Sequence, residues 1–172
     1  MSALNETTLL EAVDILCQRD STLKQVVDTF GPPPLWARTP GFPTLVHIIL
    51  EQQVSLASAR ACYDKLLIRL PELSPHNFLG LSDISLLEIG FSRQKTRYSR
   101  ILAQAIVKGS LDLPGLEQGS DHEVMTQLTA LTGIGPWTAN IYLLMALGRA
   151  DIWPVGDLAL EVALQSLRDL EH

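Results

Sequence analysis

The chain has 172 residues, 47% of them apolar, which is enough for a packed core and excludes a disordered chain. Its formal net charge of −6 excludes a uniformly basic nucleic-acid binder, because phosphate neutralisation supplies much of DNA affinity. No apolar stretch reaches the ~18 residues of a membrane helix, and the first residues lack the pattern of a signal peptide.

Apolar residues recur at helical spacing along the whole chain, which predicts an all-α protein. The segment from about Pro43 to Gln52 is rich in β-branched residues, so a strand is the alternative there. Segments 71–75 and 110–119 are expected to be loops because they are rich in proline and glycine. The expected helices cover roughly 6–19, 21–30, 43–52, 55–70, 82–90, 92–109, 121–130, 136–147 and 156–169.

Positive charge gathers on one of these helices, the one that begins at Ser92. Its sequence places Arg93, Arg97, Arg100 and Lys108 near one face, with Lys95 close by. Taken alone, such a stripe is more typical of a solvated helix surface. It indicates DNA binding only if another feature of the chain also requires DNA.

Residues 131–139, Leu-Thr-Gly-Ile-Gly-Pro-Trp-Thr-Ala, lie between two predicted helices. Gly133 and Gly135 permit a tight turn and a close approach of the backbone to a partner. Pro136 fits the first turn of the following helix, whose free N–H groups form an anion site. A phosphate would need no basic side chain there.

This stretch resembles the hairpin of the helix-hairpin-helix (HhH-GPD) DNA glycosylase superfamily, most closely the 3-methyladenine DNA glycosylase II branch. Two further motifs match in order and spacing. Residues 153–160, Trp-Pro-Val-Gly-Asp-Leu-Ala-Leu, resemble the segment that carries the family's catalytic aspartate, and residues 48–55 resemble the helix end and loop that carry its DNA wedge. The resemblance implies two helical lobes around a base-binding cleft and double-stranded DNA with damaged bases as the partner.

Asp157 is the expected catalytic residue. A carboxylate in the first turn of a helix is favoured in its charged form, and an ionised carboxylate stabilises the oxocarbenium-like transition state of glycosidic bond cleavage. The alternative is that Asp157 only caps the helix.

The hairpin is expected to contact DNA through Thr132, Gly133, Gly135 and Thr138, with Arg93 and Lys95 nearby. Gln53 matches the wedge position, where a side chain fills the gap left by a flipped base. The alternative role for Gln53 is a cap at the end of a helix.

Trp137 occupies the position at which the backbone-cleaving branch carries a nucleophilic lysine. Tryptophan cannot form a Schiff base, so the resemblance implies a monofunctional enzyme. An indole face also attracts a cationic alkylated purine, although core packing is the alternative role for Trp137.

Trp36 and Tyr142 are further candidates for the base pocket. Trp36 lies in a proline-rich loop and either lines the pocket or fixes the loop to the core. Tyr142 is offset by one position from the family's pocket aromatic, where this chain has Ile141, and Leu158 replaces another aromatic of some relatives. These departures leave the range of accepted lesions open.

The resemblance also implies that the hairpin can hold a monovalent cation through backbone carbonyls, and Thr129, Leu131 and Ile134 are the matching positions. We expect no required cofactor, since the sequence has no four-cysteine cluster for an iron–sulfur centre and no histidine pattern typical of zinc enzymes.

We expect residues 1–169 to form one glycosylase domain that is incomplete at its C-terminus, because family domains continue well beyond the aspartate. Residues 170–172 resemble the remnant of an expression tag. Such a domain should expose apolar surface, which association between chains would cover. The expected location is cytoplasmic in a bacterium or nuclear in a eukaryote.

The leading hypothesis is therefore a monofunctional glycosylase of base excision repair, which flips out alkylated purines such as 3-methyladenine or 7-methylguanine and hydrolyses the N-glycosidic bond. Its main rival is a helix-hairpin-helix module that binds DNA or senses damage without catalysis. The third hypothesis is a helical module that binds another protein and has no affinity for DNA.

Overall fold

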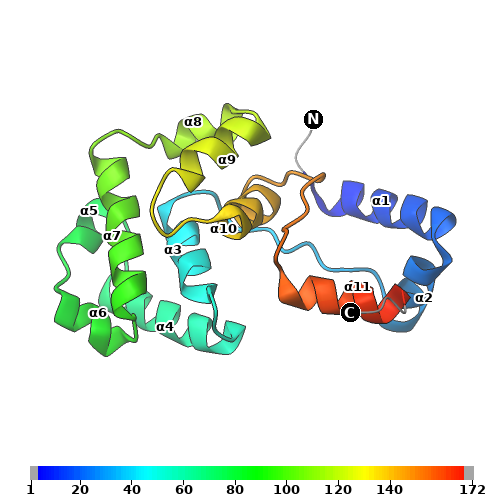
Figure 1. The fold of residues 1–172 in the computed structure, drawn as a ribbon, viewed down its shortest axis with the longest axis horizontal. Coiled ribbons are helices and arrows are strands. Elements are labelled where there is room, and N and C mark those ends of the chain that lie inside the picture. The colour runs from blue at the N-terminus through cyan, green and yellow to red at the C-terminus, as the bar shows by residue number, and fades with distance from the viewer. Residues whose placement is uncertain (1–3, 169–172) are drawn as a thin grey trace.

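The computed structural model describes residues 4–168, and this part of the chain is helical, with no strand (Figure 1). The expected all-α fold is thereby confirmed. Residues 169–172, which include the segment that resembles a tag, lie outside the described residues. The elements in chain order are α1 (Glu6–Arg19), α2 (Ser21–Phe30), α3 (Phe42–Glu51), α4 (Leu56–Arg69), α5 (Pro75–Leu79), α6 (Asp83–Ile89), α7 (Arg93–Val107), α8 (Leu113–Gln118), α9 (Asp121–Thr129), α10 (Pro136–Ile141), the π-helical turn η1 (Tyr142–Ala146) and α11 (Leu158–Arg168).

Helix α3 is the centre of the molecule. Almost every side of α3 carries apolar residues, which is typical of a helix enclosed by other helices. It packs against α4, α7, α10 and η1, and its residues Leu45, Val46, Ile48 and Ile49 have no exposed surface. The alternative of a strand at this position is therefore wrong. Burial of the β-branched residues, rather than their intrinsic preference, decides the conformation.

Side-chain caps set most helix boundaries where the sequence predicted them. The hydroxyls of Ser55, Ser82 and Ser92 accept backbone N–H groups at the starts of α4, α6 and α7. Gly90 ends α6 in the left-handed conformation, with φ of 114°.

One loop prediction is wrong, because segment 110–119 contains α8, which begins at Leu113 with Pro114 in its first turn. The break at 71–75 is confirmed, and a short helix that was not predicted, α5, begins at its last residue, Pro75. In both helices proline stands at the start, where its missing N–H costs nothing. Helix 136–147 is also not uniform, because its second half is the π-helical turn η1.

The expected apolar faces are only partly buried. The helical spacing of apolar residues would place Leu56 on one face of α4 with Ala59 and Leu66, yet Leu56 is 70% exposed, and Leu16 of α1 is 49% exposed. In α1 and α2 together, Val13 is the single buried residue.

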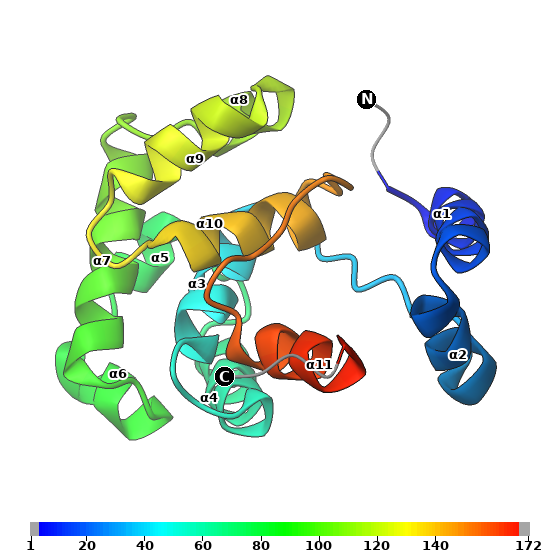
Figure 2. The ribbon, with the colours of Figure 1, turned by 45° about the vertical axis from the view of Figure 1, so that its right-hand side comes forward.

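Helices α1 and α2 form a hairpin beside the larger helical body (Figures 1 and 2), and the C-terminal end of α11 approaches the start of α2. Arg168 of α11 forms an ion pair with Asp20, the N-cap of α2. The expected exposed apolar surface is confirmed on both sides of this region. It comprises Leu10, Ile15, Leu16 and Phe30 on α1 and α2 and Leu158, Val162, Leu164 and Leu167 on α11. No helix within residues 4–168 is both long and apolar enough to cross a membrane.

Candidate functional site

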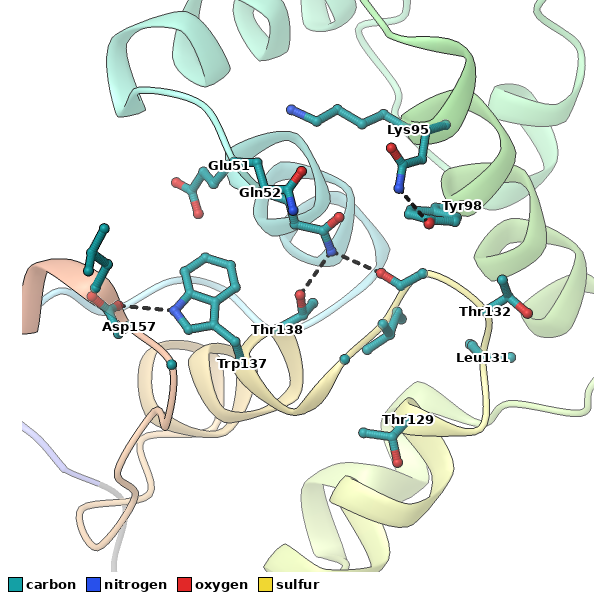
Figure 3. Close-up of a pocket in the computed structure, with 17 residues that line it drawn as sticks. Glu51, Gln52, Lys95, Tyr98, Thr129, Leu131, Thr132, Trp137, Thr138 and Asp157 are labelled. Atoms are coloured by element: carbon teal, nitrogen blue, oxygen red, sulfur yellow. Dashed lines mark hydrogen bonds between the residues drawn. The ribbon is translucent and has the colours of Figure 1, made fainter. Parts of the chain in front are cut away.

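One large cavity, of about 830 Å³, brings together parts of three predicted motifs (Figure 3). Its wall is formed by the C-terminal turn of α3, the first turns of α7, the hairpin before α10 and the start of α11. The lining residues are Glu51, Gln52, Gln53, Gln94, Lys95, Tyr98, Thr129, Leu131, Thr132, Gly133, Ile134, Gly135, Trp137, Thr138, Gly156, Asp157 and Leu158.

Asp157 uses both of its carboxylate oxygens. Oδ1 accepts the N–H of Leu160 at 3.1 Å, which is an N-cap contact at the start of α11. Oδ2 accepts the indole N–H of Trp137 at 3.0 Å (Figure 3). The capping interpretation and the proximity to the cavity therefore both hold, because one oxygen serves the helix and the other faces the indole.

Trp137 is half-buried and is the second residue of α10. Its ring packs against the core while its N–H reaches across to Asp157. Two residues separated by 20 positions are thereby fixed at one point of the cavity wall.

The hairpin has the tight turn that its glycines predicted. Gly133 adopts φ of 98°, in the left-handed region, and a Cβ atom there would lie 2.0 Å from the ring of Tyr98. Gly135 is the N-cap of α10 and has no side chain to bond the first N–H groups of the helix. Its carbonyl accepts the N–H of Ala139. The N–H groups of the first turn therefore have no acceptor within the helix, which suits an anion. Thr132 is exposed beside this turn.

Thr138 does not have the surface position that a DNA contact through its side chain requires. It is 1% exposed, and its hydroxyl accepts the side-chain N–H of Gln52 at 2.9 Å. Its side chain is held inside the fold, so the predicted DNA contact of Thr138 would be made through its backbone N–H in the first turn of α10, and it stays a prediction.

Gln53 is exposed and adopts φ of 56°, the one positive value at a non-glycine residue between residues 4 and 168. Such a conformation is strained and is common at functional sites. It turns the chain sharply out of α3, so that Gln53 lies between the large cavity and a smaller one of about 240 Å³.

The two other candidates for the base pocket lie elsewhere. Tyr142 is fully buried, and its hydroxyl accepts the N–H of Gly41 at 3.0 Å. Burial raises the pKa of this phenol. Trp36 is 66% exposed and lines a separate small cavity with Leu9 and Met145. The expectation that these two residues line the base cavity is wrong. Tyr142 is a core residue, and Trp36 lies on the surface of the segment between α2 and α3.

The basic stripe of α7 is partly structural. Arg100 binds Asp83 and the carbonyl oxygen of Leu81, both at 2.6 Å. Lys95 lines the cavity, but its ammonium donates to the Leu50 carbonyl at 2.6 Å, and burial lowers its pKa. Arg93 is exposed at the start of α7 and does not line the cavity.

Three residues at the site were not anticipated. Glu51 is 9% exposed and forms two hydrogen bonds with Arg38, of 2.8 and 2.9 Å. The side chain of Gln52 bonds the hairpin from the end of α3, and the ring of Tyr98 packs against Gly133 of the hairpin. The available signal was the polar triplet 51–53 at the end of an apolar helix, of which only Gln53 was assigned a role.

The comparisons with known proteins agree with this geometry. Residues 46–172 match the family model described as HhH-GPD superfamily base excision DNA repair protein. The YfjP protein of Bacillus subtilis is 27% identical over 129 residues, which are 70% of this chain and 45% of that protein. The chain thus spans less than half the length of this curated relative.

Two solved structures have the same fold. A crystal structure of DNA-3-methyladenine glycosidase from Bacillus halodurans is 30% identical, with a TM-score of 0.75 over 97% of this chain and 77% of that one. The 3-methyladenine DNA glycosylase Mag1 of Schizosaccharomyces pombe, solved in complex with abasic DNA, gives a TM-score of 0.84 at 23% identity, over 94% of this chain and 82% of that one. Since the family model matches well over half of the sequence, the chain belongs to the HhH-GPD superfamily of base excision DNA repair proteins.

Proposed function

We propose that this protein is a monofunctional DNA glycosylase that flips alkylated purines out of the duplex and hydrolyses their N-glycosidic bond. The observation that carries the proposal is the carboxylate of Asp157 held in the cavity by the indole N–H of Trp137. A cavity of about 830 Å³ has room for a flipped nucleotide, and the hairpin beside it presents N–H groups to a phosphate.

In the proposed reaction, water forms a bond to C1′ as the bond from C1′ to the base nitrogen breaks, and the attacking water gives up one proton to the Asp157 carboxylate or to bulk water. The bonding electrons leave with the base and neutralise its positive charge when it is an alkylated purine. The sugar passes through a cationic state that the Asp157 carboxylate stabilises. The product is an abasic site, and no amine at position 137 is present to attack it.

The preference for alkylated purines rests on Trp137 and on the similarity to 3-methyladenine glycosylases. An indole face attracts a cationic base, and a cationic base leaves readily without a strong acid. We infer 3-methyladenine and 7-methylguanine as substrates for this reason. The Mag1 complex with abasic DNA supports damaged duplex DNA as the partner.

The test is release of free methylated base from an alkylated duplex. We expect the wild-type chain to release it, and D157N to be slower by at least about a hundredfold while it still binds DNA. The amide of D157N can keep the capping oxygen but then turns an N–H toward the indole N–H. E161Q is the matched control, because it removes one negative charge from the same helix at a residue whose carboxylate only accepts the N–H of Gly156.

Two outcomes would contradict the proposal. Equal rates for D157N and the wild type would remove Asp157 from catalysis. Binding without any base release would instead identify a helix-hairpin-helix binding module.

We further propose that the carbonyl oxygens of Thr129, Leu131 and Ile134 hold a monovalent cation, as the resemblance implies. All three residues line the cavity beside the hairpin. The Leu131 carbonyl accepts the N–H of Ile134 at 3.0 Å and keeps a second lone pair. DNA affinity measured in potassium and in tetramethylammonium chloride at equal ionic strength tests the site. Equal affinities would argue against it.

A further inference from the structure

The side chain of Gln52 joins two parts of the site that lie far apart in the sequence. Its Nε2 donates to the carbonyl of Gly133 at 2.9 Å and to the hydroxyl of Thr138 at 2.9 Å (Figure 3). Gly133 belongs to the hairpin turn and Thr138 to the first turns of α10. An amide nitrogen has two hydrogens, so these two bonds use its whole donor capacity.

Gln52 is also the last residue before the strained turn at Gln53. It ends α3, with φ of −58° and ψ of 123°, and Gln53 follows in the left-handed region. The same residue therefore fixes where α3 stops and where the hairpin lies. The neighbouring Leu50 carbonyl is held by Lys95 of α7, so this end of α3 is anchored on two sides.

We propose that Gln52 is a positioning residue that holds the wedge turn at Gln53 in register with the phosphate-binding hairpin. This inference rests on the proposed function. A flipped base is held in place only if the side chain that fills its gap and the groups that grip its strand keep a fixed separation. Gln52 is the residue within 4–168 whose side chain is seen to bond the hairpin from the wedge segment.

The chemistry of the two acceptors makes the assignment specific to an amide. The Gly133 carbonyl can only accept, so a carboxylate at position 52 would place oxygen against oxygen. The Thr138 hydroxyl can rotate and donate, which would preserve at most one of the two contacts. Q52E therefore removes the link to the hairpin while it retains the length and shape of the side chain.

The first measurement is backbone amide hydrogen exchange of residues 131–138 without DNA. We expect Q52A and Q52E to raise exchange there about tenfold, the factor that corresponds to one lost hydrogen bond. T138V removes one of the two acceptors and should raise it less. Q94E is the matched control, because it brings the same charge to the cavity while the Tyr98 hydroxyl, which now accepts from Gln94, can donate to the new carboxylate.

The second measurement is single-turnover base release at saturating DNA. We expect Q52A and Q52E to be slower by about a hundredfold, the effect of a displacement of about 1 Å, with affinity for undamaged duplex close to that of the wild type. A merely structural residue would instead lower the midpoint of thermal unfolding and reduce all properties together. If Q52A unfolds globally, T138V carries the test through exchange confined to residues 131–138.

Unchanged exchange of the hairpin in Q52A and Q52E overturns the proposal, whatever the rate of base release. Increased exchange together with wild-type base release overturns it as well. If the wild type releases no base, the proposed function has failed, and hairpin exchange alone then decides whether Gln52 holds the hairpin.

Discussion

The indole nitrogen of Trp137 lies 3.0 Å from Oδ2 of Asp157, and the other oxygen of that carboxylate caps α11. The aspartate is thus held from both sides, by a side chain of α10 and by the backbone of its own helix. Its orientation depends on a residue that is remote in sequence.

We expect W137F to separate this contact from aromatic packing. Phenylalanine retains a ring for stacking on a base but has no N–H, so Oδ2 of Asp157 loses its donor while the cap to Leu160 remains. The rate of base release at saturating DNA should fall about tenfold to a hundredfold, with little change in affinity. Full activity in W137F combined with inactive W137A would show that only the ring matters.

Two glycines of the hairpin should differ sharply in their tolerance of a side chain. G133A would place a Cβ atom 2.0 Å from the Tyr98 ring and would force a positive φ on alanine, so either the hairpin or the ring must move. We expect a loss of stability of about 2 kcal/mol or more. G135A meets nothing within 4 Å at a φ of −89°, and its free energy of unfolding should stay close to the wild-type value.

Urea unfolding of G133A and G135A checks this difference in stability. The affinity of each variant for duplex DNA shows which substitution also disturbs the proposed DNA contact of the hairpin. Equal stability of G133A and G135A would contradict the close packing of hairpin and ring.

The ion pair between the half-buried Arg38 and the buried Glu51 should be costly to break from the arginine side. Glu51 is 9% exposed, so R38M would leave a buried carboxylate without its partner, at a cost of about 3–5 kcal/mol. The double variant R38M/E51M should recover most of that loss because no buried charge remains. A measured loss below about 1 kcal/mol for R38M would place the pair among weak surface contacts.

His47 should make the protein sensitive to mild acid. Its ring stacks on Tyr63 at 4.2 Å, and burial is the main cause that lowers its pKa below the ordinary value of 6.5. Arg38 and Arg60 lower the pKa further, whereas Glu51 and Asp64 raise it. The unfolded chain therefore takes up a proton at a pH where the folded protein does not.

The stability that depends on neutral His47 is complete above the ordinary pKa and is lost as the pH falls below it. We expect the free energy of unfolding to decline as the pH falls through the ordinary pKa of 6.5, and H47F, which keeps the stacking, to decline less. Identical slopes for the two proteins would assign the acid sensitivity to other groups.

Local patterns in the sequence determine several of the helix boundaries. Serine caps and helix-ending glycines predicted α4, α6 and α7 because these signals act within a few residues. Asp157, Trp137 and the hairpin were found because a motif fixes their spacing. They meet in one cavity as the resemblance implied.

The failures arise from contacts between distant segments. Whether Tyr142 faces a cavity or the Gly41 N–H depends on how η1 packs against the start of α3, and no spacing rule contains that information. Thr138 is polar, as surface residues usually are, yet it is buried, and its hydroxyl is bonded by Gln52 from 86 positions away. The same holds for Arg100, which joined a predicted basic face but binds Asp83.

Lys95 and Arg100 direct their charge to carbonyls and a carboxylate of their own fold, and the hairpin offers neutral N–H groups to a phosphate. Each phosphate neutralised by a lysine or arginine adds about −0.9 to the slope of log affinity against log salt concentration. A protein that grips DNA mainly through its backbone releases few counterions. Under the proposed function, the affinity for duplex DNA should therefore weaken only slowly as ionic strength rises, because an acidic chain would contact phosphates without opposite charge.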